Sequence, residues 1–291
     1  MSAAPLEHGY EQNAGGIYVP GQPVCHRDEE YDQAGFDILC DMQSRHFWYQ
    51  GRHRFLLRAL KDQLGAMPGR PDGLRAIDLG GGCGGWISYL NRRLPRAFSE
   101  LALGDSSLRA LELAGPVVGT GIGRYQIDLL NLGWQGRWDV AFLLDVIEHI
   151  PQDADALSQV SAALRPGGLV FVTTPALNMF WSYNDDLAHH ARRYSRGDFV
   201  QLAEKAGLQL RLARYFMFFL SPLLWLSRLK HPSVGQMSPE ELCAMARRTH
   251  RVPAAPVNWL LEFIFDLETP LGFWLPFPWG TSILGVFQKA N

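Results

Sequence analysis

The chain has 291 residues, of which 47% are hydrophobic, and this is enough for one large domain with its own core. Its formal net charge of −2 creates no overall field that attracts nucleic acid, so we expect no nucleic-acid partner. The longest apolar run, residues 215–226, is shorter than the about 20 residues that span a bilayer. We therefore expect no transmembrane span, although such a run suits peripheral contact with a membrane surface or the wall of an apolar pocket.

The cysteines indicate a reducing compartment. Cys25, Cys40, Cys83 and Cys243 include no C-x-x-C pair that would suggest a metal or redox site. The N-terminus also lacks the basic and then apolar pattern of a signal peptide. We therefore expect four reduced thiols in a cytoplasmic protein.

The first part of the chain predicts a loose arm and then a helix. Residues 1–45 are mostly polar with scattered Gly and Pro, and we expect them to form an N-terminal arm. The stretch HFWYQGRHRFLLRAL follows from His46, and its apolar residues recur at helical spacing. The residues on this apolar face are Phe55, Leu56, Ala59, Leu60 and Leu64.

Short apolar strands then alternate with helical patterns. We expect helices after a glycine-rich loop and at 107–114, 153–164 and 196–206. The expected strands are 75–79, 101–103, 125–128, 140–144, 169–173, 208–212 and the final TSILGVFQKA. This alternation predicts an α/β fold, with a seven-stranded, mostly parallel sheet and helices on both faces.

Residues 216–280, between the last two strands, hold aromatic clusters broken by prolines. Trp259, Leu260, Phe263, Ile264 and Leu267 recur at helical spacing, which suits either core packing or a binding segment. Because so long an insertion in a compact domain is uncommon, we expect a helical, aromatic-rich lid that covers the substrate.

The stretch IDLGGGCGGW poses a choice between two ligands. Gly80, Gly82 and Gly85 form G-x-G-x-x-G, the dinucleotide fingerprint. Asp78, Gly80, Gly82 and Gly84 form instead an acid-led loop without basic residues, which suits a nucleoside that carries no phosphate.

An acid ends each of the first four strands, namely Asp78, Asp105, Asp128 and Asp145. In an open α/β sheet, ligands bind beyond the carboxyl ends of the strands, so these acids are expected at one site. A carboxylate at Asp105 can accept both ribose hydroxyls, and Asp128 can accept an adenine amino group. Asp145 falls where the cationic end of a sulfonium ligand would lie.

Taken together, these motifs resemble those of the class I S-adenosylmethionine (SAM)-dependent methyltransferases. The five matching stretches are IDLGGGCGG, LGDSS, QIDLLNL, DVAFLLDVIEHIPQD and LRPGGLVFVTTP. The last strand is similar to that family's antiparallel seventh strand, and HFWYQGR and HHARRYS resemble a bacterial small-molecule subgroup. The resemblance implies a Rossmann-like domain at 46–215 and 281–291.

The resemblance also implies roles in binding SAM and its product S-adenosylhomocysteine. Gly80, Gly82 and Gly84 would approach the methionine part, and Asp105 with Ser106 would hold the ribose. Asp128 and Leu129 would hold adenine, and Asp145 and Val146 would flank the sulfonium. Arg54, or Arg52, is a candidate partner for the SAM carboxylate.

Methyl transfer to a hydroxyl needs a base and a dry site. His149 is the first candidate base, and His189 and His190 are the second. An alternative is a divalent metal on Asp145, Glu148 and His149, a cluster similar to one in some ubiquinone-pathway O-methyltransferases. The candidate substrate-site residues are Phe47, Trp48, Tyr49, Trp86, Trp181, Arg192, Arg193 and Tyr194.

We therefore expect an enzyme that methylates an oxygen on an apolar small molecule. C-methylation of an alkene, such as a prenyl diphosphate held by Arg192, Arg193 and Arg196, is an alternative. A non-catalytic SAM-binding or membrane-surface protein and an NAD-dependent oxidoreductase are alternatives from other classes. The sequence sets no oligomeric state.

Overall fold

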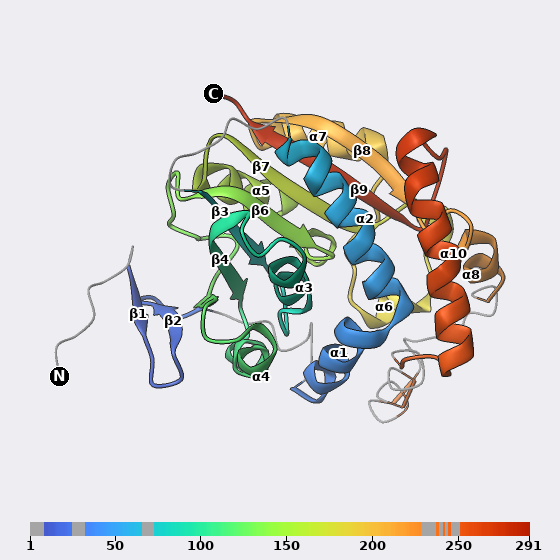
Figure 1. The fold of residues 1–291 in the computed structure, drawn as a ribbon, viewed down its shortest axis with the longest axis horizontal. Helices are drawn as coiled ribbons and strands as arrows, with labels where there is room; N and C mark the ends of the chain where they lie inside the picture. The colour runs from blue at the N-terminus through green and yellow to red at the C-terminus, as the bar shows by residue number, and fades with distance from the viewer. Residues whose placement is uncertain are drawn as a thin grey trace.

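The computed structural model describes residues 9–24, 33–65, 73–227, 237–238, 241, 244–245 and 251–291. Within these residues, nine strands form one sheet flanked by helices (Figure 1). The strands are β1 (Tyr10–Gln12), β2 (Ile17–Pro20), β3 (Leu74–Leu79), β4 (Phe98–Asp105), β5 (Gly123–Gln126), β6 (Trp138–Leu144), β7 (Leu164–Pro175), β8 (Leu208–Phe216) and β9 (Ser282–Lys289).

The main helices are α1 (Gln33–Arg45), α2 (Phe47–Leu64), α3 (Gly85–Arg93), α4 (Leu108–Val118), α5 (Asp153–Ala163), α6 (Tyr183–Leu187), α7 (Arg196–Lys205), α8 (Ser221–Ser227) and α10 (Ala255–Trp274). Short 3₁₀ turns are η1 (Ile147–His149) and η2 (Asn178–Phe180).

The strand order is β1-β2-β5-β4-β3-β6-β7-β9-β8. The strands from β5 to β7 run parallel, and β9 lies antiparallel between β7 and β8. All seven residues of β6 are buried, as expected of a parallel strand covered on both faces. The predicted α/β fold and its antiparallel last strand are confirmed. The seven predicted strands are present, but two further strands, β1 and β2, make the sheet nine-stranded.

Part of the expected N-terminal arm is instead built into the sheet. β2 pairs in parallel with β5, and β1 pairs with β2. Ile17 is buried, and the ring of Tyr18 stacks on that of Tyr125, with centroids 4.7 Å apart. A few well-placed apolar side chains therefore order a stretch whose overall composition is polar, and residues 33–45 form α1.

The expectation of four reduced thiols is wrong for one pair, because Cys40 on α1 and Cys83 in the glycine-rich loop form a disulfide. Their Cα atoms are 5.4 Å apart, although 43 positions separate them in sequence. Short spacings such as C-x-x-C could not indicate this pair, because only the folded chain brings the two cysteines together. Cys25 and Cys243 lie outside the described residues.

In the long insertion, α10 packs against α2 (Figure 1). Phe265 is fully buried there, and a Cβ added to Gly51 would lie 2.1 Å from its ring. The predicted aromatic stripe does not build this core, because Trp259, Leu260, Phe263 and Leu267 are 46–65% exposed. Across the described residues, every helix is too short or too polar to cross a membrane.

The close contact at Gly51 predicts a specific effect on stability. Gly51→Ala is expected to lower the free energy of unfolding by about 1–3 kcal/mol, because the new methyl group overlaps the Phe265 ring. The matched control is Gly197→Ala in α7, where the added Cβ meets its nearest atom at 3.6 Å, and where we expect no loss. Urea unfolding measures both. Equal stability of the two variants would contradict this packing.

Candidate active site

A cavity of about 630 Å³ lies beyond the carboxyl ends of the central strands. The ends of β3, β4 and β6 form its floor, and α1 and α2 contribute walls. This is the position where open α/β sheets bind ligands. The four strand-end acids Asp78, Asp105, Asp128 and Asp145 all line it, as do Ser106, Leu129 and Val146.

The loop after β3 turns back toward β4. Gly80, Gly82 and Gly84 have φ values of 75°, 57° and 78°, which L side chains rarely adopt. The N–H of Gly80 donates to the carbonyl of Gly104 at 2.8 Å, and the N–H of Gly82 donates to the carboxylate of Asp105 at 2.8 Å. Asp105 therefore joins the glycine loop to the second strand end.

Gln43 on α1 is a site residue that the sequence analysis missed. Its side chain donates to the carbonyl of Gly81 and accepts from the N–H of Gly85 at 3.0 Å. The amide thus bridges two points of the glycine loop, while the disulfide joins the same helix to the loop. Little in the sequence indicated this role, because α1 lies within the stretch predicted to be a polar arm.

Two of the strand-end acids differ in their surroundings. Asp78 is 1% exposed, and burial raises the pKa of its carboxyl to about 7. Asp128 is at the surface of the cavity, where its carboxylate accepts from the N–H of Leu130 at 2.9 Å. Asp128 can therefore meet a polar ligand, whereas the Asp78 carboxylate lies against the glycine loop, where a Cβ added to Gly81 would lie 2.5 Å from it.

Asp145 forms an ion pair with Arg52 of α2. Asp145 also accepts a hydrogen bond from the Thr173 hydroxyl at 3.1 Å, and its own φ is 60°. The guanidinium of Arg52 lies 4.8 Å from the ring centroid of Trp48 and 5.1 Å from that of Tyr49. A cation and two aromatic faces thus meet the acid at the end of β6.

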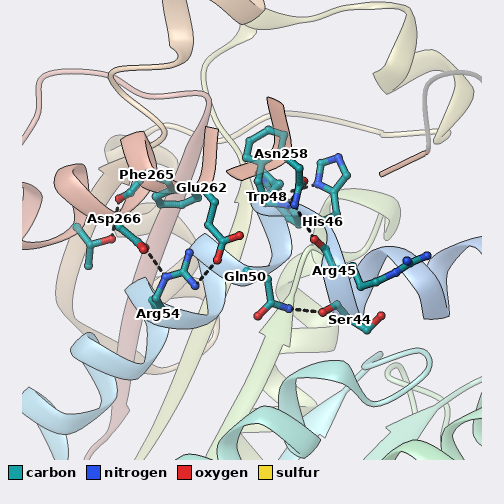
Figure 2. Close-up of polar contacts among 12 residues, drawn as sticks. Ser44, Arg45, His46, Trp48, Gln50, Arg54, Asn258, Glu262, Phe265 and Asp266 are labelled. Atoms are coloured by element: carbon teal, nitrogen blue, oxygen red, sulfur yellow. Dashed lines mark hydrogen bonds and ion pairs between the residues drawn. The ribbon is translucent and has the colours of Figure 1, made fainter. Parts of the chain in front are cut away.

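Arg54 is placed away from the cavity, which corrects its predicted role. It pairs with Glu262, at 2.8 Å, and with Asp266, both on α10 (Figure 2). Two residues along a helix correspond to about 200° of rotation, so Arg52 and Arg54 point to different sides of α2. Arg52 is the arginine that reaches the cavity.

Two of the predicted histidines meet at the opposite wall. The rings of His149 and His190 have centroids 4.8 Å apart, and both line the cavity. Nδ1 of His190 lies 2.9 Å from Asp185, which also accepts two hydrogen bonds from Arg193 at 2.7 and 3.0 Å. His189 is exposed to solvent instead. Asp185 was not predicted, because nothing in its local pattern distinguishes it from other acids.

Burial controls the charge of this wall. It lowers the pKa of His149 to about 4, with repulsion from His190 as the next cause. Burial, and then the charge of Asp145, raises the pKa of Glu148 well above its usual value. For Asp185, burial alone would raise the pKa, but hydrogen bonds from His190 and Arg193 outweigh it and lower the pKa. His149 is therefore neutral at pH 7, and Asp185 is ionised.

The arrangement also permits a metal on a set of ligands that differs from the predicted one. Atoms of Glu148, His149 and His190 lie within 4.8 Å of one another. Asp145 is paired with Arg52, so His190 takes its place in the candidate set. Two imidazoles and one carboxylate suit a transition metal such as Zn²⁺, and Asp185 would hold one of the imidazoles.

The aromatic candidates divide between the cavity and other places. Phe47, Trp48, Tyr49 and Trp86 line the cavity, and so does Arg193. The other three are held elsewhere by Asp153 and Asp186: the Tyr194 hydroxyl and Arg192 contact Asp153, and the Trp181 indole donates to Asp186. None of these three residues lines the cavity, which corrects their predicted place at the substrate.

Comparison with known proteins agrees with this geometry. A family model described as a methyltransferase domain matches residues 27–213. The chain belongs to this methyltransferase family. Membership favours the adenosyl interpretation of the glycine loop over the dinucleotide one.

Curated relatives of this methyltransferase include ubiquinone biosynthesis O-methyltransferases. The one from Marinobacter nauticus is 30% identical over 107 residues, which are 35% of this chain and 44% of the relative. The one from Bordetella avium is 26% identical over 153 residues, which are 49% of this chain and 61% of the relative. The chain thus spans about half the length of these relatives.

A solved structure shares the fold of this methyltransferase. Phosphoethanolamine N-methyltransferase 2 from Haemonchus contortus, in complex with SAM, has a TM-score of 0.56 at 17% identity. The match covers 94% of this chain and 62% of that one. Together with the family model, it confirms the predicted class, the SAM-dependent methyltransferases.

The ion pair between Arg52 and Asp145 predicts a large loss of stability when it is broken. Arg52→Met should lower the free energy of unfolding by about 3–5 kcal/mol, because it leaves a carboxylate without its buried partner. Arg58→Met, on the same helix, is the control. The exposed pair of Arg58 with Asp62 should contribute less than about 1 kcal/mol. A similar loss in both variants, measured by urea unfolding, would contradict a special role for Arg52.

Proposed function

We propose that this methyltransferase transfers a methyl group from SAM to a hydroxyl oxygen on an apolar small molecule. The proposal rests on the observation that two groups of residues, one suited to SAM and one suited to removing a proton, line the same cavity. The glycine loop and the strand-end acids form the first group. His149 and His190, backed by Asp185, form the second.

The residues of the first group fit SAM. The loop offers backbone N–H groups at positions where added Cβ atoms would collide, as at Gly80, where one would lie 2.7 Å from Val146. Asp105 would hold the ribose, and Asp128 with Leu129 would hold adenine. Arg52, which lines the cavity, would contact the SAM carboxylate in place of Arg54. When bound, SAM supplies a methyl group activated by its sulfonium.

His190 is the stronger candidate for the base. The Asp185 carboxylate at its Nδ1 can fix the tautomer and stabilise the imidazolium that forms when Nε2 accepts a proton. Among the described residues, Nδ1 of His149 has no hydrogen-bond partner, and burial disfavours the charged form of its imidazole. We therefore assign proton removal to His190, and to His149 a neutral polar contact beside it.

The acceptor is proposed to be apolar because of the remaining walls. Phe47, Trp48 and Trp86 exclude water on one side. Met217 and Leu224 are the lining residues that the long insertion contributes within its described part. We infer that this part of the insertion, rather than α10, covers the acceptor. The similarity to ubiquinone biosynthesis O-methyltransferases supports a phenolic hydroxyl on an apolar body.

The arginines argue against a prenyl diphosphate acceptor. Arg192 pairs with Asp153, Arg193 is held by Asp185, and Arg196 donates to the carbonyl of Phe277. Each of the three cations proposed for the diphosphate therefore already has a partner. O-methylation requires no such anion site.

The SAM assignment predicts that Asp105→Ala weakens SAM binding by about 1.5–3 kcal/mol, since it removes a charge-assisted hydrogen bond. Asp155→Ala, an exposed acid on α5, is the control and should bind as the unmodified protein does. Isothermal calorimetry with SAM measures both. Unchanged affinity in Asp105→Ala would contradict the ribose assignment, provided that the variant unfolds cooperatively.

The base assignment predicts that His190→Ala lowers turnover about 10²–10⁴-fold with nearly unchanged SAM affinity. His189→Ala is a matched control on the neighbouring, exposed position and should keep full turnover. The probe is a catechol that carries a short prenyl chain, and the readout is S-adenosylhomocysteine.

Two results would overturn this assignment. Activity that a chelator abolishes and a divalent ion restores would assign Glu148, His149 and His190 to a metal. Methyl transfer to geranyl diphosphate, with none to the catechol, would favour the C-methylation alternative.

A further inference from the structure

The outer face of α10 is apolar and exposed. Leu260, Phe263, Leu267, Leu271 and Trp274 follow one another at intervals of three or four residues, so they lie along one side of the helix. They are 43–83% exposed. The opposite side bears the buried residues Phe265, Glu268 and Gly272. An amphipathic helix of a monomeric protein normally turns its apolar stripe inward, and here a second stripe faces outward.

The neighbouring segments extend this face. Leu223, Trp225 and Leu226 of α8 are 45–59% exposed, and α8 lies at the same edge of the molecule as α10 (Figure 1). Of the 18 large hydrophobic side chains exposed among the described residues, 13 belong to residues 217–280. So strong a concentration indicates a contact surface rather than scattered exposure. We call it the α8–α10 face.

Polar contacts hold α10 in this orientation (Figure 2). Arg54 pairs with Glu262 and Asp266 on the flank of the helix. Asn258 accepts from the N–H of Phe47 at 2.9 Å and donates to the carbonyl of Arg45 at 2.9 Å. These bonds fix the side of α10 that faces α2, so the stripe is presented outward by a well-anchored helix.

Charge and residue type point to a lipid surface as the occupant. The sequence that joins α8 to α10, residues 228–254, contains five Lys and Arg and two Glu, while the whole chain has a net charge of −2. The positive charge therefore belongs to the same part of the sequence as the apolar residues of the two helices. Trp225, Trp259, Trp274 and Trp279 are also exposed, and indoles favour the membrane–water interface. A protein partner would need no such combination of apolar stripe, tryptophan and positive charge.

We propose that the α8–α10 face docks on an anionic lipid bilayer, with the stripe of α10 in the membrane–water interface. Within α8, Leu224 lines the cavity, whereas Leu223 and Leu226 face outward. The helix therefore separates the cavity from the lipid by a single layer, so an apolar acceptor dissolved in the bilayer would have a short path to the site. The delivery of an acceptor from the bilayer to the cavity rests on the proposed function, whereas the docking of the face on lipid does not.

The test is flotation of the full-length protein with vesicles of phosphatidylcholine alone or mixed with phosphatidylglycerol. The variant is Leu260→Ser/Phe263→Ser/Leu267→Ser. The control is Val117→Ser/Met179→Ser/Val200→Ser, which changes three equally exposed residues elsewhere. We expect binding to the anionic vesicles, at least about tenfold weaker in the stripe variant and unchanged in the control. Both variants should keep the SAM affinity of the unmodified protein, which separates this test from that of the proposed function.

Several outcomes would overturn lipid docking. One is the absence of binding to either vesicle, and another is equal binding by the stripe variant. Equal binding to neutral and anionic vesicles would refute the anionic surface. A dimer in light scattering that the stripe variant dissociates, without vesicle binding, would assign the face to a second copy of the chain.

Discussion

The buried ion pair between Arg52 and Asp145 determines how the helical layer sits on the sheet. The acid ends the central strand β6, and the base belongs to the long helix α2. A guanidinium that is 4% exposed requires its counterion, so α2 can rotate very little about its axis. Consecutive residues of a helix point in directions about 100° apart, so fixing the direction of one side chain fixes the direction in which every other residue of the helix points. The placement of Trp48 and Tyr49 against the cavity is one result.

Because its rotation is fixed, α2 contacts two different parts of the molecule. The side that carries Arg52 closes the cavity, and the side that carries Gly51 and Arg54 receives α10. Glu268 of α10 in turn accepts from the N–H of Phe219 at 2.8 Å, in the connection to α8. A chain of short-range contacts therefore leads from the end of β6 to the outer apolar face. The cavity and the exposed apolar face of α10 therefore both depend on the position of α2.

The sequence predicted those features that depend on local pattern. The alternation of strands and helices gave the sheet, and the shared edge of parallel strands brought Asp78, Asp105, Asp128 and Asp145 to one cavity, as expected. Features that depend on how helices pack were not accessible. Gln43 and the Cys40–Cys83 pair meet their partners through contacts between residues far apart in sequence, and the choice between Arg52 and Arg54 depends on helix rotation. Asp185 has its histidine and arginine partners only five and eight positions away, but they lie in an irregular segment whose side-chain directions no periodic pattern predicts. The polar composition of residues 9–24 concealed two strands, which are held by a few side chains, among them the buried Tyr10 and Ile17.

The long insertion leaves and rejoins the sheet at a single point. Phe216, the last residue of β8, is the register partner of Ser282, the first residue of β9. Strand pairing thus holds together the two ends of the insertion, at residues 216 and 282. Closing a longer or shorter loop between such ends changes the entropy of folding only slowly with length. The length of the insertion can therefore change at little cost in folding entropy, while the pairing of β8 with β9 stays the same.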